Sequence, residues 1–190
     1  MAVLGVKLVQ KRIEKEKLIE GLGKRDLETP EGVGRDLRLG AVYKIKKGSR
    51  PFIKVDDVKG QGKRRGSEVI KVVKYQKGAK KQPFITIAPG EFYLVETLEE
   101  INTPSDLMPY VFARSTLQRN GLFLKTSKTD PGYSGKLIFG LKNEGPATVD
   151  LQMGARICNI VFFEIKGGSL SYRGQHQGGR VNIGKTERQK

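Results

Sequence analysis

The residues best suited to chemistry fall in two short polar motifs that lie inside otherwise strand-like sequence. The first is Arg114-Ser115-Thr116, which combines a guanidinium group, two hydroxyl groups and the local backbone N–H groups. These donors suit the oxygens of a phosphate or carboxylate group, which an arginine can bind through two parallel hydrogen bonds. A strand end with a capped turn would also explain the tripeptide. On its own, the motif indicates anion binding without establishing it.

The second motif covers residues 130–135, reads Asp-Pro-Gly-Tyr-Ser-Gly and has the composition of a turn. Proline and glycine side by side set the backbone angles of a turn, and Gly135 adds another flexible position. Asp130 stands at the entrance of this turn. Because aspartate is a common turn former, its carboxylate becomes a catalytic candidate only in combination with other evidence.

The sequence around the motifs predicts a series of short β-strands. Apolar and β-branched runs are bounded by glycine, proline, aspartate or lysine clusters. They cover residues 42–45, 52–55, 69–75, 84–88, 92–96, 110–113, 133–141, 148–151 and 157–163. Strands at this spacing, with little helix between them, indicate a mainly β barrel or sandwich of the jelly-roll type. Before them, apolar residues at helical spacing over residues 6–22 predict an amphipathic helix, with a break or a second short helix near Gly21.

The chain is strongly basic, with a formal net charge of +16 over 190 residues. This charge implies attraction to polyanions such as nucleotides or nucleic acid, although a lysine-rich solvated surface would also produce it. The basic residues concentrate at 59–82, where Glu68 is the one acidic residue. We expect a protruding basic hairpin there, which would serve either as a polyphosphate or nucleic-acid contact or as a solvated insertion.

The single cysteine and the single histidine exclude several kinds of chemistry. Cys158 cannot form a disulfide within the chain, which fits a reducing cytoplasm. Zinc-dependent base deaminases need a site of histidine and cysteine ligands that Cys158 and His176 alone cannot build. Any deamination would therefore have to proceed without a protein-bound metal. No long apolar run is present, so we expect a cytoplasmic protein without a membrane span or signal peptide.

The C-terminal residues 166–190 are glycine-rich, polar and basic. Such a segment cannot bury a core of its own and is expected to be flexible. Its backbone N–H groups, together with Arg173 or Arg180, could close over a phosphate chain. A frayed terminus is the alternative interpretation.

Taken together, the two motifs resemble those of the dCTP deaminase branch of the trimeric dUTPase superfamily. The pattern R-S-T-L-x-R-x-G-L followed by D-P-G-Y-S-G carries this resemblance, and further similar motifs lie on both sides of it. They are D-L-R-L-G at 36–40, P-G-E-F at 89–92, G-A-R-I-C-N at 154–159, and Y-R-G-Q at 172–175 with the glycines at 178–179. In the third of these, asparagine stands where the family pattern has glutamine.

The resemblance implies a fold and an assembly. The fold is a jelly-roll-like distorted β-barrel (dUTPase-like) formed by a single domain over residues 1–190. Residues 1–30 would be a helical N-terminal segment, 59–82 a basic hairpin insertion and 166–190 a flexible C-terminal lid. The assembly implied is a homotrimer with active sites between the subunits.

The resemblance also implies a role for each matching residue. Arg114, Ser115 and Thr116 would hold phosphates from one subunit, with Arg119 near the nucleotide. In another subunit, Asp130 would activate a water molecule. The remaining contacts to sugar, base and phosphate would come from Tyr133, the backbone at Ile138 and Phe139, Asn159, Arg173 and Gln175. Mg²⁺ would be held mainly by the triphosphate itself.

Gly140 departs from the deaminase pattern, which has a glutamate at this position to transfer protons as water replaces the amine. Glycine can supply no proton, and the stretch from Arg119 to Asp130 is also shorter than in the deaminases. Release of pyrophosphate needs only an oriented water, cationic donors and a divalent ion. We therefore expect a dUTPase that converts dUTP and water to dUMP and pyrophosphate. The alternatives are a dCTP deaminase, a bifunctional deaminase–dUTPase, and a non-enzymatic nucleotide- or nucleic-acid-binding protein of the same fold.

Overall fold

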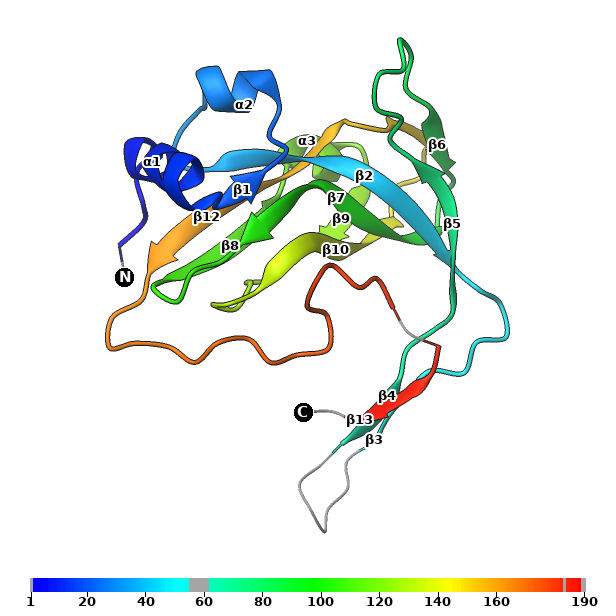
Figure 1. The fold of residues 1–190 in the computed structure, drawn as a ribbon. Helices are drawn as coiled ribbons and strands as arrows, with labels where there is room; N and C mark the ends of the chain where they lie inside the picture. The colour runs from blue at the N-terminus through cyan, green and yellow to red at the C-terminus, as the bar shows by residue number, and fades with distance from the viewer. Residues whose placement is uncertain (1, 55–61, 183, 189–190) are drawn as a thin grey trace.

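A single antiparallel sheet of eight strands curls into a nearly closed barrel (Figure 1). The computed structural model describes residues 2–54, 62–182 and 184–188. The main path of the sheet runs through β8 (Leu107–Ala113), β12 (Arg156–Glu164), β2 (Arg35–Ile45), β7 (Phe92–Asn102), β10 (Ser134–Asn143) and β9 (Leu122–Lys125). Two further strands join it, β1 (Ile19–Glu20) on β7 and β5 (Val69–Lys74) on β2.

The chain that follows β9 closes the barrel by returning to β8. Lys128 forms an isolated antiparallel bridge with Tyr110. On either side of it, the Val111 amide donates to Ser127 O at 3.3 Å and the Thr129 amide donates to Pro109 O at 2.8 Å. These bonds satisfy backbone groups that an open sheet edge would leave unpaired. The predicted mainly β, barrel-like fold with an N-terminal helix is confirmed.

Two small sheets contain the remaining strands of the described residues. β6 (Phe84–Ile87) pairs with β11 (Val149–Gln152), and β3 (Phe52–Lys54), β4 (Lys63–Arg65) and β13 (Thr186–Arg188) form a three-stranded sheet that projects from the barrel (Figure 1). The part of the chain that the structure describes also forms three short helices: α1 (Val6–Glu16), α2 (Lys24–Glu28) and α3 (Ser115–Arg119). In the described part of the chain, no helix is long and apolar enough to cross a membrane.

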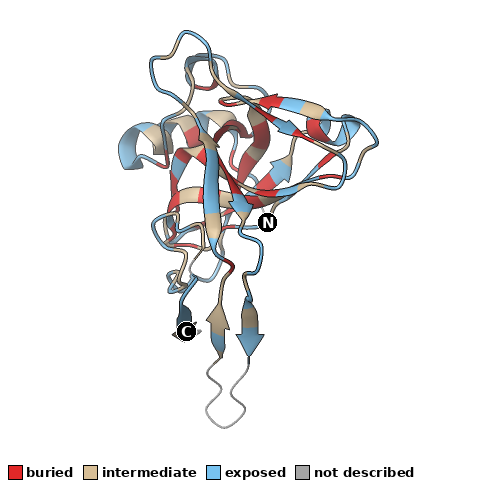
Figure 2. Ribbon diagram, turned by 90° about the vertical axis from the view of Figure 1, so that its right-hand side faces the viewer, coloured by how far each residue is buried: buried red, intermediate tan, exposed pale blue. Residues whose placement is uncertain are grey.

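Alternation along the strands builds the core inside the barrel (Figure 2). In β7 the side chains of Tyr93, Val95 and Ile101 point inward and are buried, while Phe92 and Glu100 are exposed. This period of two is what a strand with one buried face requires. Fully burying a leucine or isoleucine contributes roughly 1.5–3 kcal/mol.

The N-terminal helix ends earlier than the sequence suggests. The apolar spacing predicts a helix over residues 6–22, but Lys17 adopts a left-handed conformation with φ 54° and ends α1 at Glu16. The next residues turn into β1, where Ile19 pairs with Ile101 of β7. The break therefore lies at Lys17 rather than near Gly21, and the buried Leu18 belongs to the sheet side of the core.

The interval 59–82, for which a protruding basic hairpin is predicted, is divided between two sheets. The protruding hairpin is formed by β3 and β4, whereas β5 pairs with β2 in the barrel. The predicted division of the chain into one domain with segments 1–30, 59–82 and 166–190 stays a prediction. Parts of these segments and of the strand expected at 52–55 lie outside the described residues, at positions 1, 55, 59–61, 183 and 189–190.

A buried ion pair joins β2 to β7 in the middle of the barrel. Glu99 is completely buried and accepts hydrogen bonds from the Arg38 amide at 2.7 Å and from Arg38 Nε at 2.6 Å. Burial raises the pKa of Glu99 above its ordinary value, and the Arg38 contacts oppose this shift. The folded protein thus binds the Glu99 proton more tightly than the unfolded chain does.

The Glu99 shift predicts a pH-dependent effect of Glu99→Gln. The stabilisation linked to the proton is fully present below the ordinary pKa of 4.5 and is lost as the pH rises through the folded-state pKa. We expect the free energy of unfolding of Glu99→Gln, relative to the parent protein, to increase between about pH 4 and pH 8. Urea titrations at several pH values measure this difference. Glu100→Gln removes a charge at an exposed position of the same strand and is the control for loss of a surface charge. A difference that decreases with pH for Glu99→Gln would contradict the assignment.

Candidate active site

A cavity of about 260 Å³ lies between the turn that leads into β10 and the C-terminal part of the chain. We call it the first cavity. Its lining residues are Ser127, Lys128, Thr129, Asp130, Tyr133, Leu137, Ile138, Phe139, Tyr172, His176, Arg180 and Val181. The volume is near the small end of ligand pockets, which begin at about 300 Å³, and suits part of a nucleotide better than a whole triphosphate.

The turn at residues 130–135 is fixed by its own backbone and by the loop after β7. The Tyr133 amide donates to Asp130 O at 3.2 Å, and the Gly132 amide donates to Thr103 O at 2.8 Å. The Thr103 amide donates in return to Tyr133 O at 2.8 Å. Asp130 is thereby held at the cavity wall, where its carboxylate forms an ion pair with Lys128.

The tail segment, which we define as residues 166–182, packs its backbone directly on this turn. The Tyr172 amide donates to Pro131 O at 2.6 Å, and the Gly178 amide donates to Ser134 O at 2.8 Å. A Cβ atom added at Gly135, where φ is +134°, would lie 2.4 Å from Gly179 N. Only glycine allows so close an approach of two backbones.

Tyr133 forms a wall of the first cavity rather than an acid or base. Its ring is buried and packs edge-on against Tyr172, with ring centroids 5.5 Å apart. Its hydroxyl group donates to Lys136 O at 2.5 Å. Burial raises the pKa of Tyr133 to about 12, so the phenol stays neutral at ordinary pH. Burial likewise raises the pKa of the Cys158 thiol, which excludes a thiolate nucleophile.

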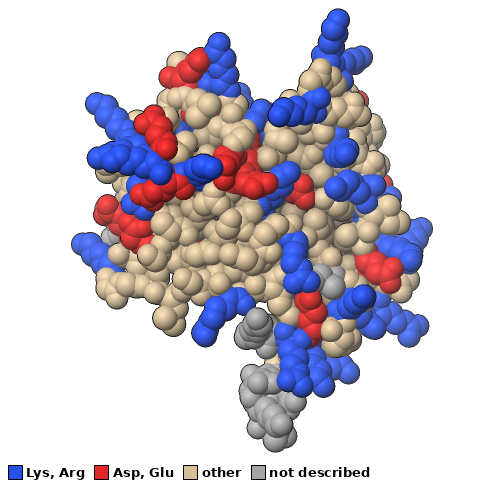
Figure 3. Space-filling model, viewed as in Figure 1, with Lys and Arg blue, Asp and Glu red and all other residues tan. Residues whose placement is uncertain are grey.

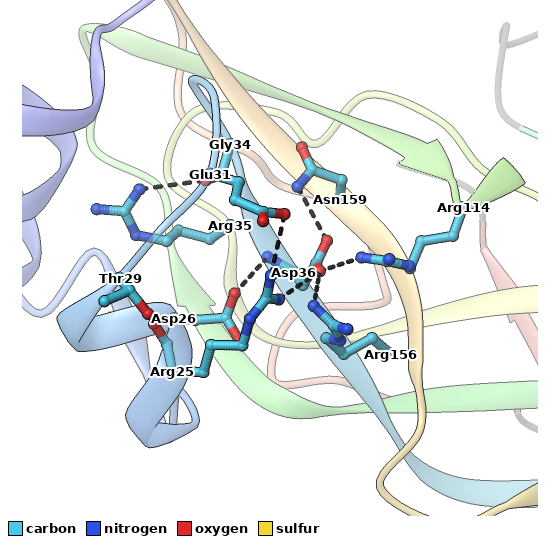
Figure 4. A network of polar contacts seen from close by, with 10 residues as sticks. All are labelled: Arg25, Asp26, Thr29, Glu31, Gly34, Arg35, Asp36, Arg114, Arg156 and Asn159. Carbon is cyan, nitrogen blue, oxygen red and sulfur yellow. Dashed lines mark hydrogen bonds and ion pairs between the residues drawn. The ribbon is translucent and has the colours of Figure 1, made fainter. Parts of the chain in front are cut away.

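A second group of polar residues surrounds Asp36, and we call it the Asp36 cluster (Figure 4). The Asp36 side chain is 8% exposed and accepts from Arg114, from Arg156 Nη1 at 2.9 Å and from Asn159 Nδ2 at 3.1 Å. Arg25 Nη1 lies 3.8 Å from the same carboxylate. The buried Asp36 carboxylate therefore pairs with three arginine side chains. Their positive charge is concentrated next to a hollow of about 200 Å³.

Three neighbouring strands place the Asp36 cluster. Asn159 of β12 pairs in register with Asp36 of β2, and Arg114 follows the end of β8, where its amide donates to Ile157 O at 3.1 Å. Ser115 begins α3 and lines the hollow. Leu117 fixes this short helix by burying its side chain in the core.

The structure brings the predicted site residues together in two groups instead of one. Asp130, Tyr133, Ile138 and Phe139 line the first cavity, and Arg114, Ser115 and Asn159 line the hollow beside Asp36. Thr116 and Arg119 are exposed on α3, and Arg173 is exposed on the tail segment. Gln175 Nε2 donates to Arg188 O at 2.5 Å. No described residue lines both spaces.

Several residues at these sites were not singled out by their sequence. Asp36 lies in the motif D-L-R-L-G, but that motif assigned it no role. The sequence feature that could have identified Asp36 is a run of charged residues inside a strand that must be buried. Unpaired buried charges cost free energy, so such residues are expected to have partners. No sequence pattern placed Lys128 or His176 at this site, because only the fold brings them to the first cavity.

Gly140 lies on β10 against the ring of Phe92. A Cβ atom added there would be 3.0 Å from Phe92 Cε2, so a larger side chain would require the ring to move. The Phe92 ring therefore lies against the position where the family pattern has glutamate. Among residues 2–54, 62–182 and 184–188, no group of three or more His, Cys, Asp or Glu side chains could hold a metal ion.

Comparison with known proteins gives consistent matches. A family model described as dCTP deaminase-like matches residues 3–165. The chain is 32% identical over 170 residues to a dCTP deaminase of Thermococcus kodakarensis, covering 89% of this chain and 90% of that protein. It is 31% identical over 166 residues to a protein of Methanobrevibacter smithii named "dCTP deaminase, dUMP-forming", covering 85% and 80% of the two chains.

A solved structure shows the same fold. The crystal structure of 2'-deoxycytidine 5'-triphosphate deaminase from Agrobacterium tumefaciens matches with a TM-score of 0.59 and 16% sequence identity. The match covers 84% of this chain and 48% of that chain. At this identity the likeness supports the barrel architecture alone.

Replacing Asp36 with asparagine tests the Asp36 cluster. The variant keeps the shape of the side chain but leaves three arginines without their shared negative charge, so we expect the free energy of unfolding to fall by about 2 kcal/mol. Thermal or urea unfolding measures this loss. Glu31→Gln is a matched control, because the Glu31 side chain is 80% exposed and pairs only with the rim residue Arg25 at 3.0 Å. It should cost less than about 0.5 kcal/mol, and equal losses for both variants would contradict the assignment.

Proposed function

We propose that this chain, which belongs to the dCTP deaminase-like family, deaminates dCTP to dUTP with release of ammonia. The observation that carries the proposal is the first cavity. It combines one carboxylate, an adjoining strand edge and a covering tail segment in a space suited to a base and its sugar. The relatives named dCTP deaminase supply the reaction class.

The expectation of a plain dUTPase is wrong. It rested on the absence of a glutamate at Gly140, whereas relatives that are 30–32% identical over most of the chain are named dCTP deaminase. The missing glutamate therefore bears on how protons are transferred, and it does not decide the class of reaction.

Recognition of the base is best supported at the edge of β10. The pairing of β10 with β9 covers Gly140 to Asn143, and the preceding residues Ile138 and Phe139 line the first cavity. A bulge between Lys136 and Ile138 changes the register against β7, and the Leu137 amide donates to Thr97 Oγ1 at 3.0 Å. Bulges of this kind redirect a strand beside a site. Backbone N–H and C=O groups at this edge would read the polar edge of the pyrimidine.

Asp130 is the carboxylate of the first cavity and takes the acid–base role in our proposal. It removes one proton from a water molecule as the oxygen attacks C4, and delivers that proton to N3 of the base. The second proton of the water then passes through the same carboxylate to the amino group. The amino group leaves as ammonia when the C4–O double bond forms. The Lys128 ammonium group, paired with Asp130, holds the carboxylate at the cavity wall during these steps.

The triphosphate would reach the Asp36 cluster of a second copy of the chain. The first cavity is too small for a whole nucleotide, and the phosphate-binding candidates Arg114 and Ser115 line a different space. In the homotrimer that we propose, the Asp36 cluster of one subunit adjoins the first cavity of the next. Thr116 and Arg119, exposed on α3, are then free to face the neighbouring subunit.

Magnesium fits this proposal as a companion of the substrate. The described residues offer no carboxylate cage, and Mg²⁺ is commonly bound through substrate phosphates with few protein ligands. The ion would neutralise phosphate charge, while Arg114 and Ser115 orient the phosphate oxygens.

A dUMP-forming deaminase is the second candidate. The relative from Methanobrevibacter smithii carries this name, and Asp130 beside Lys128 could also orient a water toward a phosphate. Such an enzyme would convert dCTP to dUMP, pyrophosphate and ammonia. Chromatography of the products from dCTP separates the two candidates, because the first ends at dUTP.

Asp130→Asn should abolish turnover of dCTP while leaving nucleotide binding intact. The amide cannot accept the proton of the water, and a general base contributes about 10²- to 10⁴-fold to the rate. Initial rates of ammonia release, with calorimetric titration of dCTP, separate turnover from binding. Asp150→Asn, exposed on β11 and bonded to Thr86 Oγ1, is the control and should retain the parent rate. Normal turnover by Asp130→Asn would remove Asp130 from the mechanism.

A further inference from the structure

The far end of the C-terminal region is bound to the protruding hairpin by strand pairing. β13 lies antiparallel to β4, with Thr186 opposite Arg65, Glu187 opposite Arg64 and Arg188 opposite Lys63. β3 occupies the other edge of β4, so the hairpin and the chain end form one small sheet (Figure 1). A two-stranded hairpin on its own is only marginally stable in water, and a third strand adds a further ladder of backbone hydrogen bonds.

Side chains extend this pairing to the wall of the first cavity. His176 and Arg180 both line the cavity. Arg64 Nη2 of β4 lies 3.1 Å from His176 Nε2, and Arg180 Nη2 donates to Glu187 Oε1 of β13 at 2.8 Å. Each of these two cavity residues is thus held by one strand of the small sheet.

We propose that the β3–β4 hairpin is a docking surface for β13 of the same chain, and that this docking fixes the tail segment over the first cavity. Two sets of contacts then hold the part of the tail segment that covers the first cavity. Its near attachment is the contact of Gly178 and Gly179 with the turn at Gly135, and its far attachment is the pairing of β13 with β4. Opening the first cavity requires the release of at least one of them.

The charges of β4 and β13 explain why the β3–β4 hairpin binds β13. Lys63, Arg64 and Arg65 make β4 entirely basic, and Lys and Arg side chains gather around the base of the hairpin (Figure 3). Glu187 is placed opposite Arg64 and also pairs with Arg180, so it neutralises positive charge from both sides. Opposite charges across a strand pair are favourable, and like charges are not.

The same basic hairpin could contact nucleic acid, which the composition of the chain also suggests. In the structure, however, the free edge of β4 is covered by β13, and Arg64 contacts a residue of the first cavity. These contacts favour an attachment within the chain. Binding to nucleic acid becomes an outcome of the test below.

A chain that ends at Gly184 tests the docking, because it lacks β13 and keeps the whole tail segment. A chain that ends at Arg188 keeps β13 and is the matched control. Hydrogen–deuterium exchange is measured without nucleotide over residues 172–182. We expect at least tenfold faster exchange there in the chain ending at Gly184, and parent rates in the control. Equal exchange in the two chains would overturn the proposal.

Two further readouts separate this proposal from its alternatives. Protection that falls when the protein is diluted would place β13 on a second copy and contradict docking within one chain. Unchanged exchange together with strong, salt-dependent binding of DNA to the hairpin would also overturn the proposal. The effect on catalysis rests on the proposed function, where we expect the KM for dCTP to rise severalfold in the chain ending at Gly184. The exchange measurement needs no activity and stands apart from it.

A point substitution tests the charge argument. Glu187→Lys removes the pair with Arg180 and places like charges opposite each other on β13 and β4. We expect exchange over residues 172–182 to accelerate by about three- to tenfold, which corresponds to a loss of about 0.7–1.4 kcal/mol. Glu28→Lys makes the same charge change at an exposed position of α2 and should leave the exchange unaltered. Slower or equal exchange in Glu187→Lys would contradict the electrostatic part of the proposal.

Discussion

The direct contact between the backbone of the tail segment and the glycines of the turn is the constraint on which the site depends. At Gly135 the two backbones approach so closely that any side chain would force them apart, and a Cβ atom at Gly132 would lie 2.9 Å from Ser171 Cβ. One wall of the first cavity comes from the turn and β10, and the opposite wall comes from the tail segment. Without glycine at these positions the chain would present an open groove with Asp130 on its surface.

Paired charge is the second organising feature. In water, an exposed ion pair contributes little, but a buried carboxylate must be matched by donors that replace its hydration. Asp36 and Glu99 are matched in this way by arginines on neighbouring strands. In the Asp36 cluster the matching groups are also the donors that suit a triphosphate. In the function that we propose, Arg114 would exchange the Asp36 carboxylate for a phosphate, so its charge would stay paired with or without a nucleotide.

The parts of the fold that follow from local pattern could be predicted from the sequence. The spacing of short apolar runs predicted a mainly β barrel or sandwich, and the composition of residues 130–135 predicted a turn with Asp130 at its entrance. The start of β2 could not be predicted, because Arg35 and Asp36 are buried and Arg38 is partly buried, and the partners of these charges lie far away in sequence. Arg114 to Thr116 were expected at a strand end, and β8 does end at Ala113, but the short helix α3 that follows, with Leu117 buried, was not predicted. The covering of the first cavity depends on contacts between residues 130–135 and 171–179, and a pattern within either segment contains no information about them.

We propose that the first cavity deaminates the cytosine base of dCTP without a glutamate at Gly140. The most direct test is the yield of ammonia from dCTP incubated with purified protein and Mg²⁺, compared with the loss of dCTP on chromatography. We expect one ammonia for each dCTP consumed, with dUTP or dUMP as the nucleotide product. Recovery of unchanged dCTP without ammonia, under conditions where the protein binds dCTP, would contradict it.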